Sequence, residues 1–271
     1  MTRQLVQETE RRLLEPICEF KNEDGYTVFK SEKFPNFWGG NGLRLIRSEN
    51  RSLDDWENTF SKHFDPNFFS HRTFSFEEAP EFEHLKDEAT SKNYKIEITT
   101  SLMVTNDSQS EPLLDEFTIH HVATERDWNR LRVFYDDTSK DEDWYDASDG
   151  TRELFDKIRY TSEAIGIDWF YISQSGCDDI LAKAGIFKHG GICRLQDVMT
   201  IKPWRRQKLA SMLVSFLICR ALEDTKGLAC LAVADYYAID LYKNLGFQDC
   251  GNSVCLMKYP RHLSADQKQP K

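Results

Sequence analysis

The sequence predicts a mixed α/β protein of two domains, and three observations support this. The chain has 271 residues, which is enough for two domains of ordinary size. Segments with strand character alternate with segments whose apolar residues recur at helical spacing. A polar stretch rich in turn formers, residues 106–116, separates the two halves. We therefore expect an N-terminal α/β domain at residues 1–112 and a second domain at residues 113–271.

The first half contains signals for two helices and two strands. Apolar residues from Leu53 to Phe64 recur at helical spacing after Ser52, a residue type that caps helix N-termini. A second helix is expected at 80–90, between strands at 72–77 and 94–104. The glycine cluster at 38–42 runs into a strand-like segment and lacks the ending of a phosphate loop, so we expect a structural turn there.

The second half is a regular succession of strands and helices. Strands are expected at 117–122, 168–173, 180–188, 192–201, 228–234 and 254–259. Helices are expected at 125–135 and 151–164, along the apolar stripe from Ala210 to Ala221, and in a segment that contains Leu241 and ends at Gly246. The pair Gly190 and Gly191 indicates a tight hairpin. Hairpins combined with helical crossovers predict a mixed, α+β type of sheet.

A basic turn at the start of the long apolar helix is the strongest chemical signal. Arg205, Arg206 and Lys208 fall at the first turn of that helix. The positive end of the helix dipole and its unpaired N–H groups repel cations but attract anions. This arrangement predicts a binding site for a phosphate-bearing ligand.

Composition excludes several classes of protein. The net charge of −10 argues against nonspecific nucleic-acid binding and favours cationic partners. No apolar run reaches the roughly 18 residues that a membrane span needs, and the N-terminal residues are charged, so we expect a cytoplasmic protein.

Metal ligands are not evident in the sequence. Seven cysteines lie at wide spacing without a CxxC pair, which favours free thiols. His120 and His121 are adjacent on a strand and point to opposite faces, so they do not form a metal pair. We expect no metal site.

Two segments resemble a known family, the GCN5-related N-acetyltransferases (GNAT). The run Arg205-Arg206-Gln207-Lys208-Leu209-Ala210 resembles the family's Arg/Gln-x-x-Gly-x-Gly/Ala turn, and residues 238–247 resemble its Ala-x-x-Leu-Tyr-x-x-x-Gly-Phe segment. The resemblance covers residues 116–260. It implies the acyl-CoA N-acyltransferase (GNAT) fold, acetyl-CoA as cosubstrate, and direct transfer of acetyl to a primary amine. Since tandem GNAT proteins occur, the first domain is either a degenerate copy or a domain that shapes the acceptor cleft.

The resemblance also implies roles for individual residues. The expected cofactor-binding residues are Val198, Met199 and Thr200 for the pantetheine arm, Arg205, Arg206, Gln207, Lys208, Leu209, Ala210 and Ser211 for the pyrophosphate, and Asp235, Ala238 and Tyr242. Tyr242 is the expected general acid for the leaving thiolate; its alternative is a core tyrosine. Lys208 stands where the family usually has glycine, and its side chain either blocks the phosphate site or pairs with a phosphate oxygen. Asp235 stands near the usual asparagine.

The catalytic base and the acceptor are less defined. Asp197 and His189 are candidate bases, although such residues are often structural. Residues 136–150 contain seven carboxylates together with Trp144 and Tyr145, which suits a cationic acceptor such as a polyamine or a lysine peptide. The alternative is a solvated loop.

Other functions compete with the enzyme. An inactive acyl-CoA-binding or protein-interaction module with the same fold is suggested by Lys208. A nucleotide-phosphate binder is less favoured because no purine or ribose motif accompanies the turn. An oligomeric form is compatible with the sequence.

Overall fold

The computed structural model describes residues 2–35, 37–48, 50–69, 71–106, 111–139, 150–233 and 238–259. The chain forms two compact units, each built from two separate stretches. Unit 1 contains Met1–Pro16 and Ser101–Cys250, and unit 2 contains Ile17–Thr100 and Gly251–Lys271. The single boundary between residues 112 and 113 that the sequence suggests stays a prediction.

Unit 1 is built on a mixed sheet. Its strands, in the order β10-β9-β8-β7-β6, are β10 (Leu228–Val233), β9 (Ile192–Thr200), β8 (Ala182–His189), β7 (Asp168–Gln174) and β6 (Phe117–His121). Neighbours from β6 to β9 are antiparallel, whereas β9 and β10 are parallel. The β8–β9 hairpin turns at Gly190 and Gly191, which both have positive φ as expected for this type of turn.

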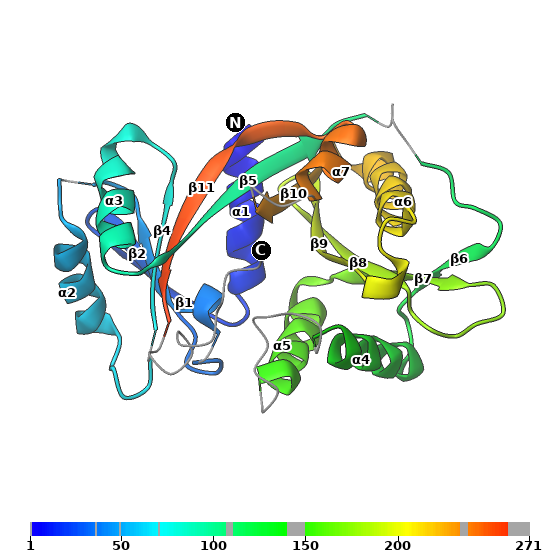
Figure 1. Ribbon diagram of the computed structural model, residues 1–271, viewed down its shortest axis with the longest axis horizontal. Helices are drawn as coiled ribbons and strands as arrows, with labels where there is room; N and C mark the ends of the chain where they lie inside the picture. The colour runs from blue at the N-terminus through cyan, green and yellow to red at the C-terminus, as the bar shows by residue number, and fades with distance from the viewer. Residues whose placement is uncertain are drawn as a thin grey trace. The chain divides into compact units, whose positions relative to one another are not determined.

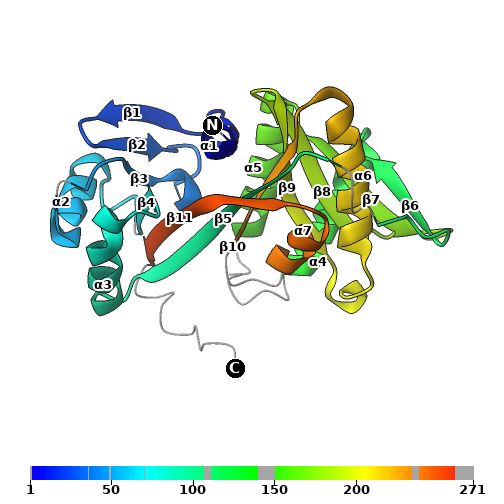
Figure 2. The same cartoon turned by 90° about the horizontal axis from the view of Figure 1, so that it is seen from above.

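Helices cover both faces of this sheet (Figures 1 and 2). They are α4 (Glu125–Ser139) and α5 (Gly150–Ile165) on one face, and α6 (Leu209–Asp224) and α7 (Ala238–Asn244) on the other. The α6 side is the larger apolar core, in which Leu213, Leu217 and Ile218 are completely or almost completely buried. A further helix, α1 (Thr2–Leu14), packs against α5 and β9.

Unit 2 has a sheet with the strand order β1-β2-β3-β4-β11. Its elements are β1 (Glu19–Glu23), β2 (Tyr26–Lys30), η1 (Trp38–Gly40), β3 (Gly42–Leu45), α2 (Leu53–His63), β4 (Arg72–Glu77), η2 (Pro80–Phe82), α3 (Glu83–Ser91), and most of β5 (Lys95–Val104) and β11 (Gln248–Lys258). Ser52 caps α2 in a reciprocal box with Asp55. The core of this unit is rich in aromatic residues, including Trp56, Phe60 and Phe74.

The expected fold class and most expected elements are confirmed. Helix α7 ends before Gly246, which has φ of 87°, as expected for a glycine just past a helix end. Helix α1 and strands β1 and β2 were not predicted from the sequence, and β11 begins earlier than predicted. In the described part of the chain, no helix combines the length and apolar character that crossing a bilayer requires.

Candidate functional site

The turn that precedes α6 has an unusual backbone. After β9 the chain forms a short 3-10 helix, η3 (Lys202–Trp204), and α6 then begins at Leu209. Arg206 and Lys208 have φ of 67° and 63°. The left-handed conformation costs an L-residue about 1–2 kcal/mol, which explains why glycine suits the Lys208 position.

The backbone N–H groups of this turn are open. Within the described chain, the N–H groups of Gln207 to Ser211 have no hydrogen-bond acceptor, and the first bond of the helix runs from the Met212 N–H to the Lys208 carbonyl at 2.9 Å. Gln207 and Lys208 are also exposed. A helix N-terminus combined with a left-handed turn forms a concave group of donors that suits an anion.

The Lys208 side chain forms an ion pair instead of lying free. Its Nζ lies 2.8 Å from Glu111 Oε1. The Glu111 N–H in turn donates to Ser215 Oγ at 2.8 Å, which ties this segment to α6. The lysine amino group is therefore held by an internal carboxylate.

Strands β9 and β10 separate beside this turn. Their described parallel pairing consists of Cys193 with Leu228 and Arg194 with Ala229. Beyond this point β9 continues to Thr200 and β10 to Val233 with no further pairing between the described residues. We call this opening the fork. The β10-facing edge of Val198 to Thr200, the expected pantetheine site, therefore lacks a strand partner in the described chain, and the Thr200 carbonyl accepts from Arg205 Nε at 3.2 Å.

A bulge in β9 accompanies the fork. Lys183 pairs with Met199 and Gly185 with Gln196, so Asp197 and Val198 together oppose one residue of β8. Asp197 has φ of 52°. The bulge redirects β9 shortly before the turn.

Tyr242 lies buried in the core that α6 and α7 form with the sheet. Its side chain is 6% exposed, and its ring centre lies 5.3 Å from that of Phe247. Burial raises the pKa of its hydroxyl well above the usual value. The hydroxyl has no hydrogen-bond partner among the described residues. It is a protonated donor at neutral pH.

Asp197 belongs to a buried polar cluster. Lys183, which is fully buried, places its Nζ 2.5 Å from Asp197 Oδ2. The Tyr135 hydroxyl donates to the same Asp197 oxygen and accepts from Lys183 Nζ. The rings of Tyr135 and Trp169 lie 4.1 and 4.8 Å from the Lys183 cation.

The pKa values of Lys183 and Asp197 depend on each other. Burial lowers the pKa of Lys183 to about 8, although Asp197 opposes the shift. Burial alone would raise the pKa of Asp197, but attraction and hydrogen bonding from Lys183 outweigh it and lower that pKa. Asp197 as a catalytic base stays a prediction. His189 lies at the β8–β9 hairpin, about 16 Å along β9 from the bulge, so the structure does not bring it to Asp197.

The sequence of this part of the chain matches a known family model, described as the acetyltransferase (GNAT) family, over residues 117–247. The match contains the open turn, the fork and Tyr242. Residues 117–247 belong to the GNAT family. A search of curated proteins with the sequence finds no match.

Solved structures with similar folds extend beyond the GNAT segment. A conserved protein of unknown function from Staphylococcus epidermidis has a TM-score of 0.72 at 13% identity and covers 90% of this chain and 94% of its own. A GCN5-related N-acetyltransferase from Kribbella flavida has a TM-score of 0.65 at 15% identity and covers 97% of each chain. A tandem GNAT protein from the clavulanic acid biosynthesis pathway has a TM-score of 0.55 at 10% identity, with 86% and 78% covered. At these identities the likeness establishes the fold.

Other predicted residues of the GNAT segment are only partly described. Asp235 and residues 140–149 of the acidic stretch lie outside the described residues. Ala238, the first residue of α7, packs against the α6 core. Asp136 and Asp137 lie exposed near the end of α4.

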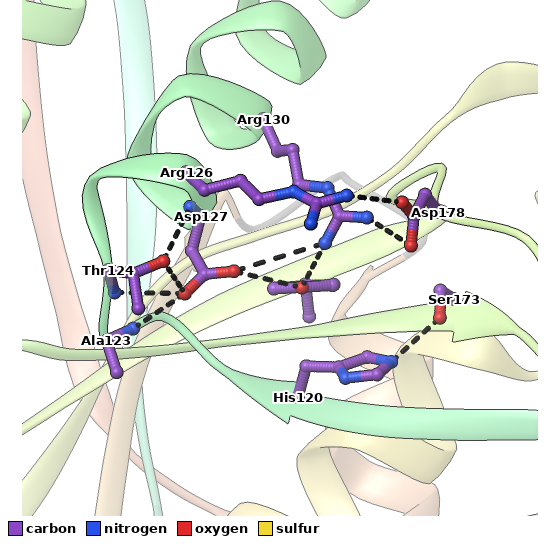
Figure 3. A network of polar contacts seen from close by, with 9 residues as sticks. His120, Ala123, Thr124, Arg126, Asp127, Arg130, Ser173 and Asp178 are labelled. Carbon is purple, nitrogen blue, oxygen red and sulfur yellow. Dashed lines mark hydrogen bonds and ion pairs between the residues drawn. The ribbon is translucent and has the colours of Figure 1, made fainter.

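A polar network that the sequence analysis missed fixes α4 on β7 (Figure 3). Asp127 Oδ2 accepts from the Thr124 N–H at 2.9 Å and the Thr124 hydroxyl at 2.7 Å, which caps the helix. Arg130 Nη1 donates to the Tyr171 hydroxyl at 3.0 Å and its other nitrogen pairs with Asp178. The network holds the helix that carries Tyr135. A Thr-x-x-Asp signature before the helix could have revealed its cap.

His120 and His121 point to opposite faces of β6, as expected. His120 Nε2 lies 2.8 Å from Ser173 Oγ (Figure 3). The His120 ring also stacks on Tyr171, with ring centres 4.8 Å apart. His121 Nε2 lies 3.2 Å from Asp168 Oδ1. The described residues contain no group of three or more His, Cys, Asp or Glu side chains suited to hold a metal ion.

Proposed function

We propose that this protein is a cytoplasmic N-acetyltransferase that moves an acetyl group from acetyl-CoA directly to a cationic primary amine. The observation that carries the proposal is the run of open N–H groups from Gln207 to Ser211 beside the unpaired edge of β9. The turn suits the pyrophosphate of CoA, and the strand edge suits the amide groups of its pantetheine arm. All seven cysteines are free thiols, which fits a reducing compartment.

The residues present fit this cosubstrate. Gln207 to Ser211 would hold the pyrophosphate, with Arg205 and Arg206 as neighbouring cations, and Val198 to Thr200 would hold the pantetheine arm. Acetyl-CoA supplies an activated thioester when bound. Because Lys208 already adopts the conformation that glycine would have, and its amino group pairs with Glu111, its presence is compatible with an open turn.

Tyr242 is the proposed general acid. A phenol with a raised pKa stays protonated at neutral pH and can donate its proton as a thiolate leaves. Asp197 is the candidate base, and its mutation is part of the tests below. Asp235 and Ala238 remain proposed contacts of the cofactor.

A cationic acceptor is supported by charge. The chain has a net charge of −10, and Asp136 and Asp137 are exposed where the acidic segment begins. Such a field raises the local concentration of polyamines or lysine-bearing peptides.

Unit 2 is proposed to be a degenerate copy of the GNAT fold. Support comes from its α/β composition and from the fold likeness to a tandem GNAT protein. The alternative, a domain that shapes the acceptor cleft, would not require a shared ancestry.

Calorimetric titration with acetyl-CoA tests the proposal, with Lys208→Gly in parallel. Micromolar binding by the native chain, followed by turnover in a screen of amines, would support it. A second candidate, an inactive acyl-CoA-binding or interaction module, is motivated by Lys208 at the position where the family usually has glycine. Binding without turnover on any amine would favour that module. Absence of binding in both proteins would exclude the acetyl-CoA interpretation.

A further inference from the structure

Arg194 lies at the apex of the fork. Among the described residues, it is the last residue of β9 that pairs with β10, opposite Ala229. The Cys193 N–H donates to Gly227 on the β10 side, and because main-chain directions alternate along a strand, the Leu195 carbonyl points the same way. Arg194 Nε donates to that carbonyl at 2.8 Å. The arginine side chain therefore replaces the strand partner that β9 loses when β10 departs.

The guanidinium is buried and held from a distant part of the sequence. Arg194 is 5% exposed. Its Nη2 lies 3.0 Å from Glu10 Oε2 on α1. Its Nη1 is buried and has no hydrogen-bond partner among the described residues. Burying a cation with an unused hydrogen-bond donor is unfavourable. Such a group therefore indicates a further role.

Electrostatic effects connect this cation with the proposed acid. Burial raises the pKa of both Tyr242 and Cys230, and the Arg194 charge opposes the rise in each case. Cys230 directly follows Ala229, the residue of β10 that pairs with Arg194, and Tyr242 on α7 belongs to the same apolar core as Cys230. A positive charge near this position would stabilise a thiolate that forms in the fork.

We propose that Arg194 is a positioning residue of the transfer site: tethered by Glu10, its guanidinium holds β9 and supplies a buried positive charge at the fork. This inference rests on the proposed function. It adds a residue that lies outside both matched motifs, together with a helix, α1, that precedes the GNAT segment.

Three variants of the full chain test the proposal. Arg194→Met removes the charge at similar length, Arg194→Lys keeps a charge, and Glu10→Gln weakens the tether. Arg130→Met is the matched control, since Arg130 also has a carboxylate partner, although its side chain is 22% exposed and it lies on α4. Circular dichroism and thermal melting confirm that each variant folds.

The first readout is kinetic. Arg194→Met should lower kcat about tenfold while the Kd for acetyl-CoA changes less than threefold, because the turn before α6 provides most of the affinity. Arg194→Lys should recover part of kcat. A merely structural role would lower the melting temperature with kcat unchanged, and that result would overturn the proposal.

The second readout is amide hydrogen exchange, which needs no activity. Arg194→Met, and to a smaller extent Glu10→Gln, should speed exchange in residues 195–200 and 230–233, whereas Arg130→Met should leave these segments unchanged. Unchanged exchange in Arg194→Met, or equal changes in the control, would overturn the role of Arg194 at the fork. If the wild-type chain neither binds nor turns over acetyl-CoA, the proposed function fails, and exchange still decides the role at the fork.

Discussion

Lys208 shows how a single residue can depart from a family pattern without destroying the backbone on which the pattern depends. Its φ of 63° is the conformation for which glycine is usually selected. The lysine adopts it, and its amino group pairs with Glu111. The internal carboxylate therefore competes with any phosphate for the same cation.

Removal of this competitor should strengthen cofactor binding. Glu111→Gln is expected to lower the Kd for acetyl-CoA about two- to fivefold, since an exposed ion pair contributes up to about 1 kcal/mol. Calorimetry at low and high salt measures the effect, which should shrink with salt. Glu116→Gln, on the same segment, is the control. Weaker binding by Glu111→Gln would show that the pair supports the turn.

Replacement of the proposed acid should separate binding from turnover. Tyr242→Phe keeps the buried ring but removes the proton donor, so kcat should fall at least tenfold with an unchanged Kd for acetyl-CoA. Steady-state kinetics combined with calorimetry measure both. Tyr160→Phe, at an exposed position on α5, serves as control. Full activity in Tyr242→Phe would make this residue a core tyrosine.

The Lys183–Asp197 pair, in which Lys183 is fully buried and the Asp197 side chain is 26% exposed, should be costly to break from one side. Lys183→Met leaves the carboxylate without its cation and should lower the free energy of unfolding by less than the roughly 3–5 kcal/mol of a fully buried pair, because solvent reaches Asp197. The double variant Lys183→Met/Asp197→Asn should be more stable than Lys183→Met alone. Urea unfolding of the two single variants and the double variant provides the cycle. Strict additivity would mean that the pair is not coupled, and turnover by Asp197→Asn would exclude Asp197 as an essential base.

At the scale of elements, α4 links the sheet to the buried cluster. Its N-terminal cap, formed by Thr124 and Asp127, fixes where the helix begins, and Tyr135 lies near its other end. The turn proposed to bind the cofactor precedes a different helix, α6, on the opposite face of the sheet. A substitution in the α4 cap should therefore lower the stability of the fold without changing the affinity for acetyl-CoA.

Loss of the α4 cap should test this separation. Thr124→Ala should lower the free energy of unfolding by about 1 kcal/mol, with a Kd for acetyl-CoA within twofold of wild type. Chemical denaturation and calorimetry provide the two values, and Thr118→Ala on β6 is a control at an exposed position. A large loss of affinity in Thr124→Ala would mean that α4 and the turn are coupled.

The elements also show how far sequence patterns reach. Strong periodicity predicted α2, α6 and the strands from β6 to β10, because one buried face leaves a clear apolar repeat. Helix α1 was missed because polar and charged residues together outnumber the apolar ones in its sequence. The resemblance implied only that Val198 to Thr200 hold the pantetheine arm, and the fork itself was not predicted, since periodicity does not reveal where a strand loses its neighbour. Lys183 and Arg194 read as polar residues in strands, and only the fold shows their burial.

At the scale of the whole molecule, net charge should govern the choice of acceptor. The chain carries a charge of −10, and the acidic segment at 136–150 contributes seven carboxylates. Long-range attraction of this kind is screened by salt. The attraction should therefore appear as a salt dependence of kcat/KM for the acceptor.

The kcat/KM for a polyamine should fall several-fold between low and high salt, while that for a neutral primary amine of similar size changes little. Neutralising Asp141, Glu142 and Asp143 together should remove most of the difference in salt dependence between the two amines. Steady-state kinetics across a salt series measure it. An unchanged acceptor KM in the neutralised variant at every salt concentration would contradict the role of the segment.

Because unit 1 is built from two distant stretches of the chain, its parts leave the ribosome at different times during synthesis. Glu10 and Arg194 are separated by 184 positions in the sequence, yet they form one ion pair. At about 5–20 residues per second, α1 emerges roughly 10–40 seconds before its strand partner is synthesised. During this interval the apolar side of the nascent helix, including Val6 and Leu13, has to remain without its packing partners or be shielded by a chaperone.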